Sequence, residues 1–164
     1  MKRANTTIKL ANVTGQSAKV VSDQLTAVWN NFYNGSKNLE FYADAMAALG
    51  ATTASSSSEI AKGLEKFAAI ANSTGLSFEY ASSALATVVA NTRLSADSVG
   101  TSFKTLFSRL QGLKLGETLE DGTNLNKYSS SLLTVGVNIK QANGELKNMD
   151  TILSELGTKW KALA

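Results

Sequence analysis

Residues 52–63 read TTASSSSEIAKG, and the four consecutive serines allow two interpretations. A serine run is typical of a flexible linker, which would divide the chain into two tethered pieces. However, Glu59 follows Ser56 by three residues. That is the spacing of a capping box, in which both side chains satisfy free N–H groups at a helix start. Apolar side chains then recur along one helical face, so the stretch predicts a helix over residues 57–73.

The same helix start recurs at a constant spacing of 39 residues, at Ser17, Ser56 and Ser95, each with a threonine three positions earlier. The apolar stripes that follow superpose in three sets, namely Val21, Ile60 and Val99, then Leu25, Leu64 and Phe103, then Val28, Phe67 and Leu106. These matches predict a helix-pair (α-hairpin) repeat of about 39 residues, in which each unit stacks on the next to bury its apolar face. Chance alignment of helical periodicities is the alternative interpretation.

An all-α fold is predicted because the sequence contains no proline, the residue that interrupts helices, while 43% of its residues are hydrophobic. Helices are expected at residues 7–13, 18–33, 38–49, 57–73, 78–91, 96–111, about 124–136 and 150–163. Val137 and Ile139 alternate with polar residues before an Asn-Gly pair. This pattern predicts a short extended or β-hairpin-like segment near residues 137–148.

The repeat pattern breaks after Gln111, which suggests two parts. Residues 1–115 are predicted to form the helical repeat core. Residues 116–164 are predicted to form a loop–helix–hairpin–helix extension that packs on the same domain. Four glycines are interpreted as helix ends, at Gly50, Gly75, Gly112 and Gly136. The last helix is expected to be capped by Asp150 and to carry an apolar stripe formed by Ile152, Leu153, Leu156, Trp160 and Leu163.

The sequence offers little catalytic chemistry. It contains no histidine and no cysteine, which excludes disulfides, thiolate zinc sites and the usual nucleophile–base pairs. Ser58 and Lys62 lie one helical turn apart, but such pairs arise by coincidence in a serine-rich chain. Glu117, Glu120 and Asp121 are best explained as a solvated loop rather than an acid–base pair. We therefore expect no enzyme activity, no cofactor and no metal site.

Aromatic residues are densest in the stretch VWNNFYNGSKNLEFY, residues 28–42. The favoured interpretation is that they pack the first helix pair together, because aromatic side chains bury large areas. The alternative is that Trp29 and Tyr33 face outward as anchors for a partner protein. Leu113 and Leu115, at the other end of the predicted repeats, form a second candidate partner-binding pair.

Charge and hydropathy suggest neither nucleic acid nor membrane as a partner. The net charge is +3, and the basic residues are scattered along the chain, so we expect no specific nucleic-acid binding. The longest apolar run, residues 85–90, is interrupted by Thr87 and is too short to span a bilayer, so we expect no membrane contact from this segment.

Two stretches are similar to a known family. GLEKFAAIANSTGLSFEYASSALATVVANTRLSADSVGTSFKTLFSRLQGL, residues 63–113, resembles the core region of phage tail tape measure proteins. The likeness rests on the motif A-x-x-x-G-L-S at residues 71–77 and on S-A-x-x-V-G-T-x-x-K-T-L-F-x-R-L at residues 95–110. LLTVGVNIKQANGELKNMDTILSELGTKWKAL, residues 132–163, is similar to the segment that follows that core. Each motif is short, but their order and spacing agree over residues 17–163.

The resemblance implies a structural module of a bacteriophage or prophage tail tape measure protein. Such a module acts in tail assembly, tail length determination and genome ejection through protein–protein contacts. The implied partners are other tape measure copies, tail tube or tail-tip proteins and a tail-assembly chaperone. The implied location is the virion tail, and the cytoplasm of the infected bacterium during assembly.

The chain also departs from the family pattern. It lacks the long coiled-coil stretches of complete members, so it is expected to be one domain of a longer protein. Its frequent glycines and repeated apolar faces favour a folded module over the uninterrupted helix that a ruler requires. Two alternatives remain: a free-standing α-helical repeat adaptor that binds a protein partner, and a hydrolase that uses serine and lysine.

Overall fold

The structure is a computed structural model that describes residues 2–53, 55–115 and 126–163, with no side-chain description at 2, 111–115, 126–128 and 163. The described residues form eight helices and no strand, which confirms the predicted all-α class. In chain order the helices are α1 (Lys2–Thr14), α2 (Ala18–Phe32), α3 (Leu39–Thr52), α4 (Ser57–Ser73), α5 (Phe78–Thr92), α6 (Ala96–Leu115), α7 (Asn126–Thr134) and α8 (Met149–Leu163).

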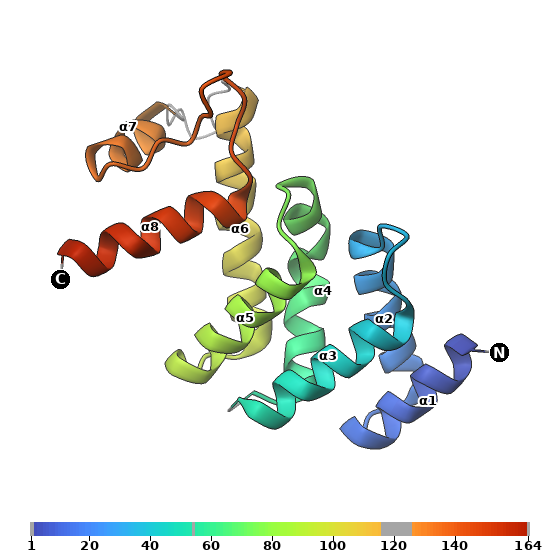
Figure 1. Cartoon of the computed structure of the whole chain (residues 1–164). Helices are drawn as coiled ribbons and strands as arrows, with labels where there is room; N and C mark the ends of the chain where they lie inside the picture. The colour runs from blue at the N-terminus through green and yellow to red at the C-terminus, as the bar shows by residue number, and fades with distance from the viewer. Residues whose placement is uncertain (1, 54, 116–125, 164) are drawn as a thin grey trace.

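The first six helices form two layers, which we call the helical stack (Figure 1). Helices α2, α4 and α6 lie side by side in one layer, and α4 packs against both of its neighbours. Helices α1, α3 and α5 cross them in the second layer, where α3 packs against both α1 and α5. Each helix of the stack therefore mainly contacts helices that are one or two positions away from it in chain order.

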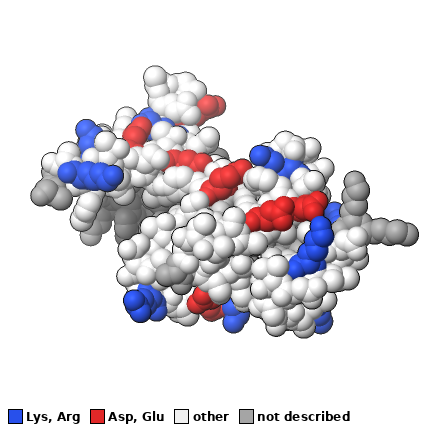
Figure 2. Space-filling model, turned by 60° about the horizontal axis from the view of Figure 1, so that its bottom comes forward, with Lys and Arg blue, Asp and Glu red and all other residues white. Residues whose placement is uncertain are grey.

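Helices α3, α5 and α8 each carry an acidic residue in the first turn. Glu40, Glu79 and Asp150 lie in the first turns of α3, α5 and α8. A negative charge there is favoured by the free N–H groups and the dipole of the helix. Figure 2 shows acidic side chains in a row across one face of the molecule, with basic side chains at separate places around them.

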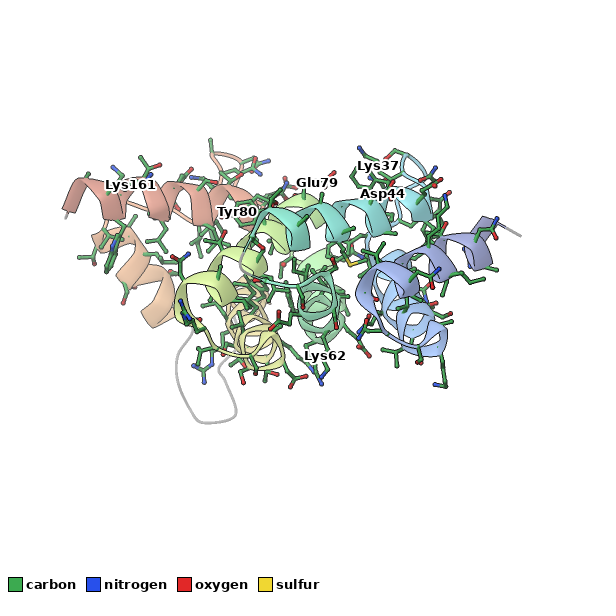
Figure 3. All side chains as sticks on the ribbon, turned by 90° about the horizontal axis from the view of Figure 1, so that it is seen from below. Lys37, Asp44, Lys62, Glu79, Tyr80 and Lys161 are labelled. Atoms are coloured by element: carbon green, nitrogen blue, oxygen red, sulfur yellow. The ribbon has the colours of Figure 1, made fainter. Side chains whose placement is uncertain are left out.

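Helix α8 continues the row of the second layer beyond α5, as both Figure 1 and Figure 3 show. Its N-terminus is fixed to the turn between α4 and α5. The Met149 N–H donates to the Thr74 carbonyl at 3.3 Å, and the Ser77 N–H donates to the Asp150 carboxylate at 3.4 Å. Met149 is buried in the main core. These contacts dock the start of α8 on the stack.

The three helix starts predicted at Ser17, Ser56 and Ser95 are confirmed. The Ser17, Ser56 and Ser95 hydroxyls accept the N–H three residues later, at 3.4, 3.2 and 3.2 Å. At Ser56 the capping box is complete, because the Glu59 carboxylate accepts the Ser56 N–H at 2.8 Å. The serine run is therefore a helix start and not a linker.

Helix α4 occupies the centre of the main core. It buries seven residues, namely Ile60, Ala61, Gly63, Leu64, Phe67, Ala68 and Ala71. Phe67 is 1% exposed and packs edge-on against Phe103 of α6, with ring centroids 5.2 Å apart. Phe107 is also 1% exposed and lies 5.9 Å from the Phe67 ring. These aromatic contacts join α4 to α6.

Two glycines allow α4 and α6 to approach at their crossing. A Cβ atom on Gly100 of α6 would lie 2.5 Å from the Gly63 carbonyl oxygen of α4. A Cβ atom on Gly63 would lie 2.9 Å from the Ala96 carbonyl oxygen. Neither position has room for a side chain, because real Cβ atoms do not approach backbone atoms so closely.

Two of the four glycines interpreted as helix ends have that role. Gly75 and Gly136 adopt φ angles of +77° and +78°, the left-handed conformation in which a glycine follows a helix without strain. The assignment was wrong for the other two, because α3 continues through Gly50 to Thr52, and α6 continues through Gly112. A Cβ atom on Gly50 would collide with the backbone nitrogen of Ser57, so this glycine permits a close helix contact instead.

Two helix starts also differ from the prediction. Helix α1 begins at Lys2 and not near Thr7, so it is longer than expected. Helix α8 begins at Met149, so Asp150 lies inside the first turn and does not cap the helix. Its carboxylate instead accepts the Ser77 N–H of the neighbouring helix pair.

The C-terminal extension, described here at residues 126–163, has a small core of its own. Its buried residues are Val137, Ile139 and Ile152, with Leu132, Val135, Leu146 and Leu156 packed against them. The segment between α7 and α8 forms one isolated antiparallel bridge, between Lys140 and Leu146. Gly144 makes the turn at a φ of +84°. The remainder of the predicted loop, residues 116–125, lies outside the described residues.

Candidate interaction surfaces

The aromatic cluster is built by the turn between α2 and α3. Trp29 and Tyr33 lie one turn apart at the end of α2, so their rings stack with centroids 4.0 Å apart and an interplanar angle of 18°. Tyr42 of α3 meets the Trp29 ring edge-on at 6.0 Å. The cluster thus joins the first helix pair, as the sequence predicted.

Tyr42 forms the inner side of this cluster. Its side chain is 1% exposed, and its hydroxyl donates to the Phe32 carbonyl at 2.8 Å. Burial raises the pKa of the Tyr42 hydroxyl, with smaller contributions from the nearby Glu79 and Tyr33. The ring also meets Phe78 of α5 edge-on at 4.9 Å, which links the first helix pair to the second.

Tyr33 forms the outer side of the cluster. It is 48% exposed, whereas Trp29 is only partly exposed. The Arg3 guanidinium of α1 lies over the Trp29 ring, 5.1 Å from its centroid, in a cation–π contact. The structure therefore brings the two predicted partner-binding aromatics together, but only Tyr33 offers much of its surface to a partner.

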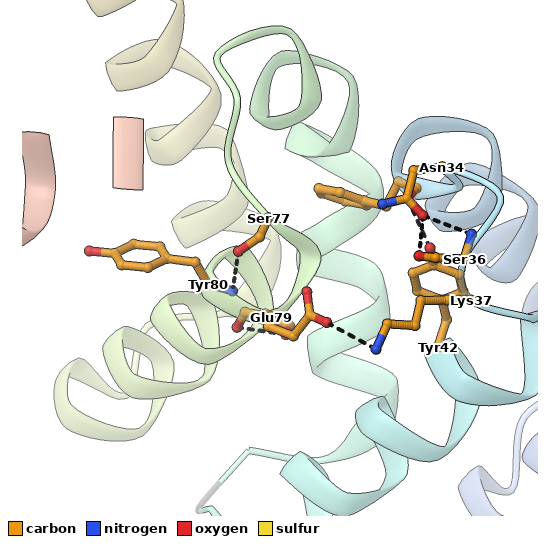
Figure 4. A network of polar contacts seen from close by, with 9 residues as sticks. Asn34, Ser36, Lys37, Tyr42, Ser77, Glu79 and Tyr80 are labelled. Carbon is orange, nitrogen blue, oxygen red and sulfur yellow. Dashed lines mark hydrogen bonds and ion pairs between the residues drawn. The ribbon is translucent and has the colours of Figure 1, made fainter. Parts of the chain in front are cut away.

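A polar recess of about 230 Å³ lies beside the cluster, between the α2–α3 and α4–α5 turns. Figure 4 shows its polar contacts, in which the Lys37 ammonium faces the Glu79 carboxylate at 4.0 Å. The Asn34 side-chain oxygen accepts the Ser36 N–H at 3.1 Å. These groups can donate hydrogen bonds to a polar ligand and accept hydrogen bonds from it. Such groups are better suited to binding a ligand than to catalysing a reaction on it.

The second predicted pair, Leu113 and Leu115, lies in the last turns of α6. Their side chains fall outside the described part of the structure, so their role as contact residues stays a prediction. Two exposed apolar residues were assigned to buried stripes from the sequence. Leu106 of α6 is 43% exposed and Trp160 of α8 is 72% exposed. Neither side chain belongs to the main core or to the small core of the extension.

The residues considered for catalysis do not form a site. Lys62 is exposed, and within the described residues it makes no hydrogen bond to Ser58. In Figure 3, Lys62 points away from the face that carries Glu79 and Tyr80. The acidic residues at 117, 120 and 121 lie outside the described part. Among the described residues, no three acidic side chains are grouped closely enough to hold a metal ion.

The described part contains no helix that is both long enough and apolar enough to cross a membrane. No solved structure matches the chain. A family described as phage-related minor tail protein matches it over residues 1–164.

The chain belongs to the phage-related minor tail protein family. Because the match covers every residue, it includes the stack, the aromatic cluster and the extension. Membership supports a structural role in a phage tail, with other tail proteins as partners and the virion tail as its location. It also suggests a non-enzymatic protein.

Proposed function

We propose that this chain is a folded module of a bacteriophage or prophage tail tape measure protein. In this proposal it acts in tail assembly, tail length determination and genome ejection, and it acts by contacting other proteins. Membership of the phage-related minor tail protein family carries the proposal. The order of the motifs at residues 71–77 and 95–110 supports the narrower assignment to tape measure proteins.

The proposed architecture is a repeat of about 39 residues. Its units pair α2 with α3 and α4 with α5, and α6 begins a third. The equal spacing of the caps at Ser17, Ser56 and Ser95 supports it. A stacked unit contacts only its neighbours, so its exposed faces are free to bind other proteins. Residues 1–115 form the core in this scheme, and residues 116–164 form an extension on the same domain.

The proposed partners are other tape measure copies, tail tube or tail-tip proteins and a tail-assembly chaperone. During assembly these contacts take place in the cytoplasm of the infected bacterium. Tyr33, together with Trp29, is the proposed contact point at one end of the stack. Leu113 and Leu115 are the proposed contact points at the other end.

An in-frame deletion of residues 17–163 within the phage gene tests the proposal. A role in assembly or ejection predicts loss of infectious particles, because the contacts made by this module are missing. Tail length, measured by electron microscopy, separates the possible roles. Normal titres with tails of normal length would exclude a role in the tail. Infectious phages with tails shortened in proportion to the deletion would identify a ruler and exclude a separate folded module.

The second candidate function is a free-standing helical adaptor, which the exposed aromatic surface at Tyr33 favours. Peptide mass spectrometry of purified virions separates the two candidates. Peptides from this chain in intact particles, at a constant ratio to tube protein, support the tail module. Their absence from particles, with the chain still present in the lysate, supports the adaptor.

A further inference from the structure

The polar recess between the α2–α3 and α4–α5 turns has a volume of about 230 Å³, and every residue that lines it is among the described residues. Sites for cofactors and other small molecules are usually larger, about 300–1,000 Å³. A recess of this size has room for one side chain and the groups next to it. We therefore consider a short part of a larger molecule as its ligand.

The floor of the recess is apolar. Phe32, Leu76 and Phe78 line it and are buried, as is Tyr42. The Tyr42 hydroxyl already donates to the Phe32 carbonyl, so neither group needs a partner from a ligand. The floor therefore favours an apolar group, which loses contact with water when it enters.

The rim of the recess carries side-chain amides from two elements. Asn30 and Asn34 come from the end of α2 and the turn after it, and Asn72 comes from the last turn of α4. Among the described residues, Asn30 and Asn72 have no hydrogen-bond partner for their side chains. An asparagine amide offers an acceptor oxygen and two donor hydrogens, the same kinds of group as a peptide bond. The rim can therefore pair with peptide groups.

Two opposite charges face each other across the rim. The Lys37 ammonium lies 4.0 Å from the Glu79 carboxylate, too far for a direct hydrogen bond (Figure 4). The ammonium also lies 4.2 Å from the centre of the Phe41 ring, in a cation–π contact. An anion that approaches Lys37 meets the charge of Glu79, and a cation that approaches Glu79 meets that of Lys37. A neutral group with a donor beside an acceptor bonds to both, and a peptide group is of this kind.

We infer that the polar recess binds an extended segment of another protein. One apolar side chain of that segment enters the floor, and its flanking peptide groups pair with Lys37, Glu79 and the amides of the rim. The inference deepens the proposed function, because it states the chemistry of a partner at the end of the stack near Tyr33. A saccharide fits the recess less well, since its hydroxyl groups would lose water against the apolar floor.

The smallest probe with this chemistry is N-acetyl-leucine N′-methylamide, in which one apolar side chain lies between two peptide groups. The probe is titrated into the intact ¹⁵N-labelled chain and followed by NMR. A ligand of so few atoms gains limited affinity, so we expect a dissociation constant of about 1–10 mM. The shifts should saturate and should be largest at the side-chain amides of Asn30, Asn34 and Asn72.

Two matched variants locate the site. Asn72→Ala removes one amide of the rim and is expected to weaken binding about fivefold, as the loss of one hydrogen bond does. Asn12→Ala is the control. Asn12 is an exposed asparagine of α1 that lies outside the recess, so its loss should leave the affinity unchanged. Because both side chains are exposed, neither variant should unfold more easily than the wild type.

Charged forms of the probe test the roles of Lys37 and Glu79. N-acetyl-leucine carries a carboxylate and leucine N-methylamide carries an ammonium group, and we expect both to bind more weakly than the neutral probe. In Lys37→Glu the rim has two carboxylates, so the ammonium form should become the tightest of the three. A purely structural role of Lys37 would not change this order.

Several outcomes would overturn the inference. They are the absence of shifts at about 50 mM neutral probe, shifts confined to residues outside the recess, and an affinity that Asn72→Ala leaves unchanged. A charged form that binds the wild type as tightly as the neutral probe would overturn it as well. Shifts at the recess with methyl α-glucoside but not with the neutral probe would identify a saccharide site instead.

These outcomes are independent of the phage experiment. Loss of infectivity on deletion, together with no probe binding, would leave the proposed tail function intact and remove only the peptide site. Probe binding with normal infectivity on deletion would keep the peptide site and remove the tail function.

Discussion

Helices α4 and α8 are alike in length and pattern but differ in burial. They contain 17 and 15 residues, and each carries an apolar face along its length. Helix α4 buries seven residues, whereas Met149 and Ile152 are the only buried residues among the described side chains of α8. From Gly157 to Ala162 every residue of α8 is exposed, and Trp160 is 72% exposed.

The two helices differ in burial because they differ in the number of elements that pack against them. Helix α4 packs against α2 and α6 in its own layer and against α3 and α5 across it. Helix α8 is fixed near its start, to the turn between α4 and α5, and along one side, to the small core of the extension. An amphipathic pattern therefore predicts which face of a helix is apolar, but the number of neighbouring elements determines how much of it is buried.

The largest expected effect is that of Phe67→Ala in α4. Removing a buried ring leaves a cavity between α4 and α6, and we expect a loss of about 3–5 kcal/mol in the free energy of unfolding. Urea denaturation followed by circular dichroism measures this loss. Leu106→Ala is the control, because this side chain on α6 is 43% exposed, and it should cost less than about 0.5 kcal/mol. Equal midpoints for both variants would contradict the central position of α4.

Gly100→Ala tests the close approach of α4 and α6. Because the added methyl group would lie 2.5 Å from the Gly63 carbonyl oxygen, the two helices must separate. We expect a loss of about 1–3 kcal/mol, as is usual for overpacked sites. Thermal unfolding of the variant measures it. A gain in stability would show that the helices do not touch at this crossing.

Ser56→Ala tests how α4 begins. We expect a loss of about 0.5–2 kcal/mol at neutral pH, because the variant leaves the Glu59 N–H without its cap. Hydrogen bonds from the Ser56 N–H and hydroxyl lower the pKa of the Glu59 carboxyl. The stability contributed by this carboxylate is therefore present above the pKa of the unfolded state, and it is lost as the pH falls through the lowered pKa.

The difference between wild type and Ser56→Ala should consequently shrink as the pH is lowered below about 4, the usual range of a glutamate. Urea titrations of both proteins at a series of pH values measure it. A difference that stays constant down to about pH 2 would show that the carboxylate takes no part in the cap.

The smallest expected effect, of opposite sign, is that of Gly157→Ala in α8. Apart from the backbone of α8 itself and the two chain neighbours, no described atom lies within 4 Å of the position that a Cβ would occupy at Gly157, so the new methyl group has room. Alanine is the better helix former by about 0.8–1.0 kcal/mol, so we expect a gain of up to that size. Hydrogen exchange of the α8 amides detects the change locally. Loss of protection would indicate a neighbour that contacts this side of α8.

The helices of the stack could be predicted from the sequence because their start signals are local. A capping serine and a following apolar stripe lie within one segment, so Ser56 and Glu59 were sufficient to place α4. Glycines were harder to interpret, because a glycine at a helix end and a glycine at a helix crossing look alike in sequence. Gly50 was misassigned for this reason, since its role depends on Ser57 of the next helix.

The place of α8 in the second layer could not be predicted, because α7 and the turn after it separate α8 from α6. Its first turn nevertheless resembles those of α3 and α5. Leu39, Phe78 and Met149 are the apolar first residues of the three helices, and an acidic residue follows each of them. The match lies outside the 39-residue spacing, so a search at constant spacing misses it. Among the candidate contact residues, only the mutual stacking of Trp29 and Tyr33 follows from their spacing.

The order of contacts within the stack also determines how the molecule responds to a mechanical load. The main contacts of α2 are with α1, α3 and α4, and those of α4 are with α2, α3, α5 and α6. A tension applied between the two chain ends therefore detaches the outermost helix first and leaves the interfaces behind it intact. A pair of 39 residues that is pulled straight spans about 130–140 Å. The stack is thus expected to lengthen in separate steps, each of which separates one unit from its neighbours.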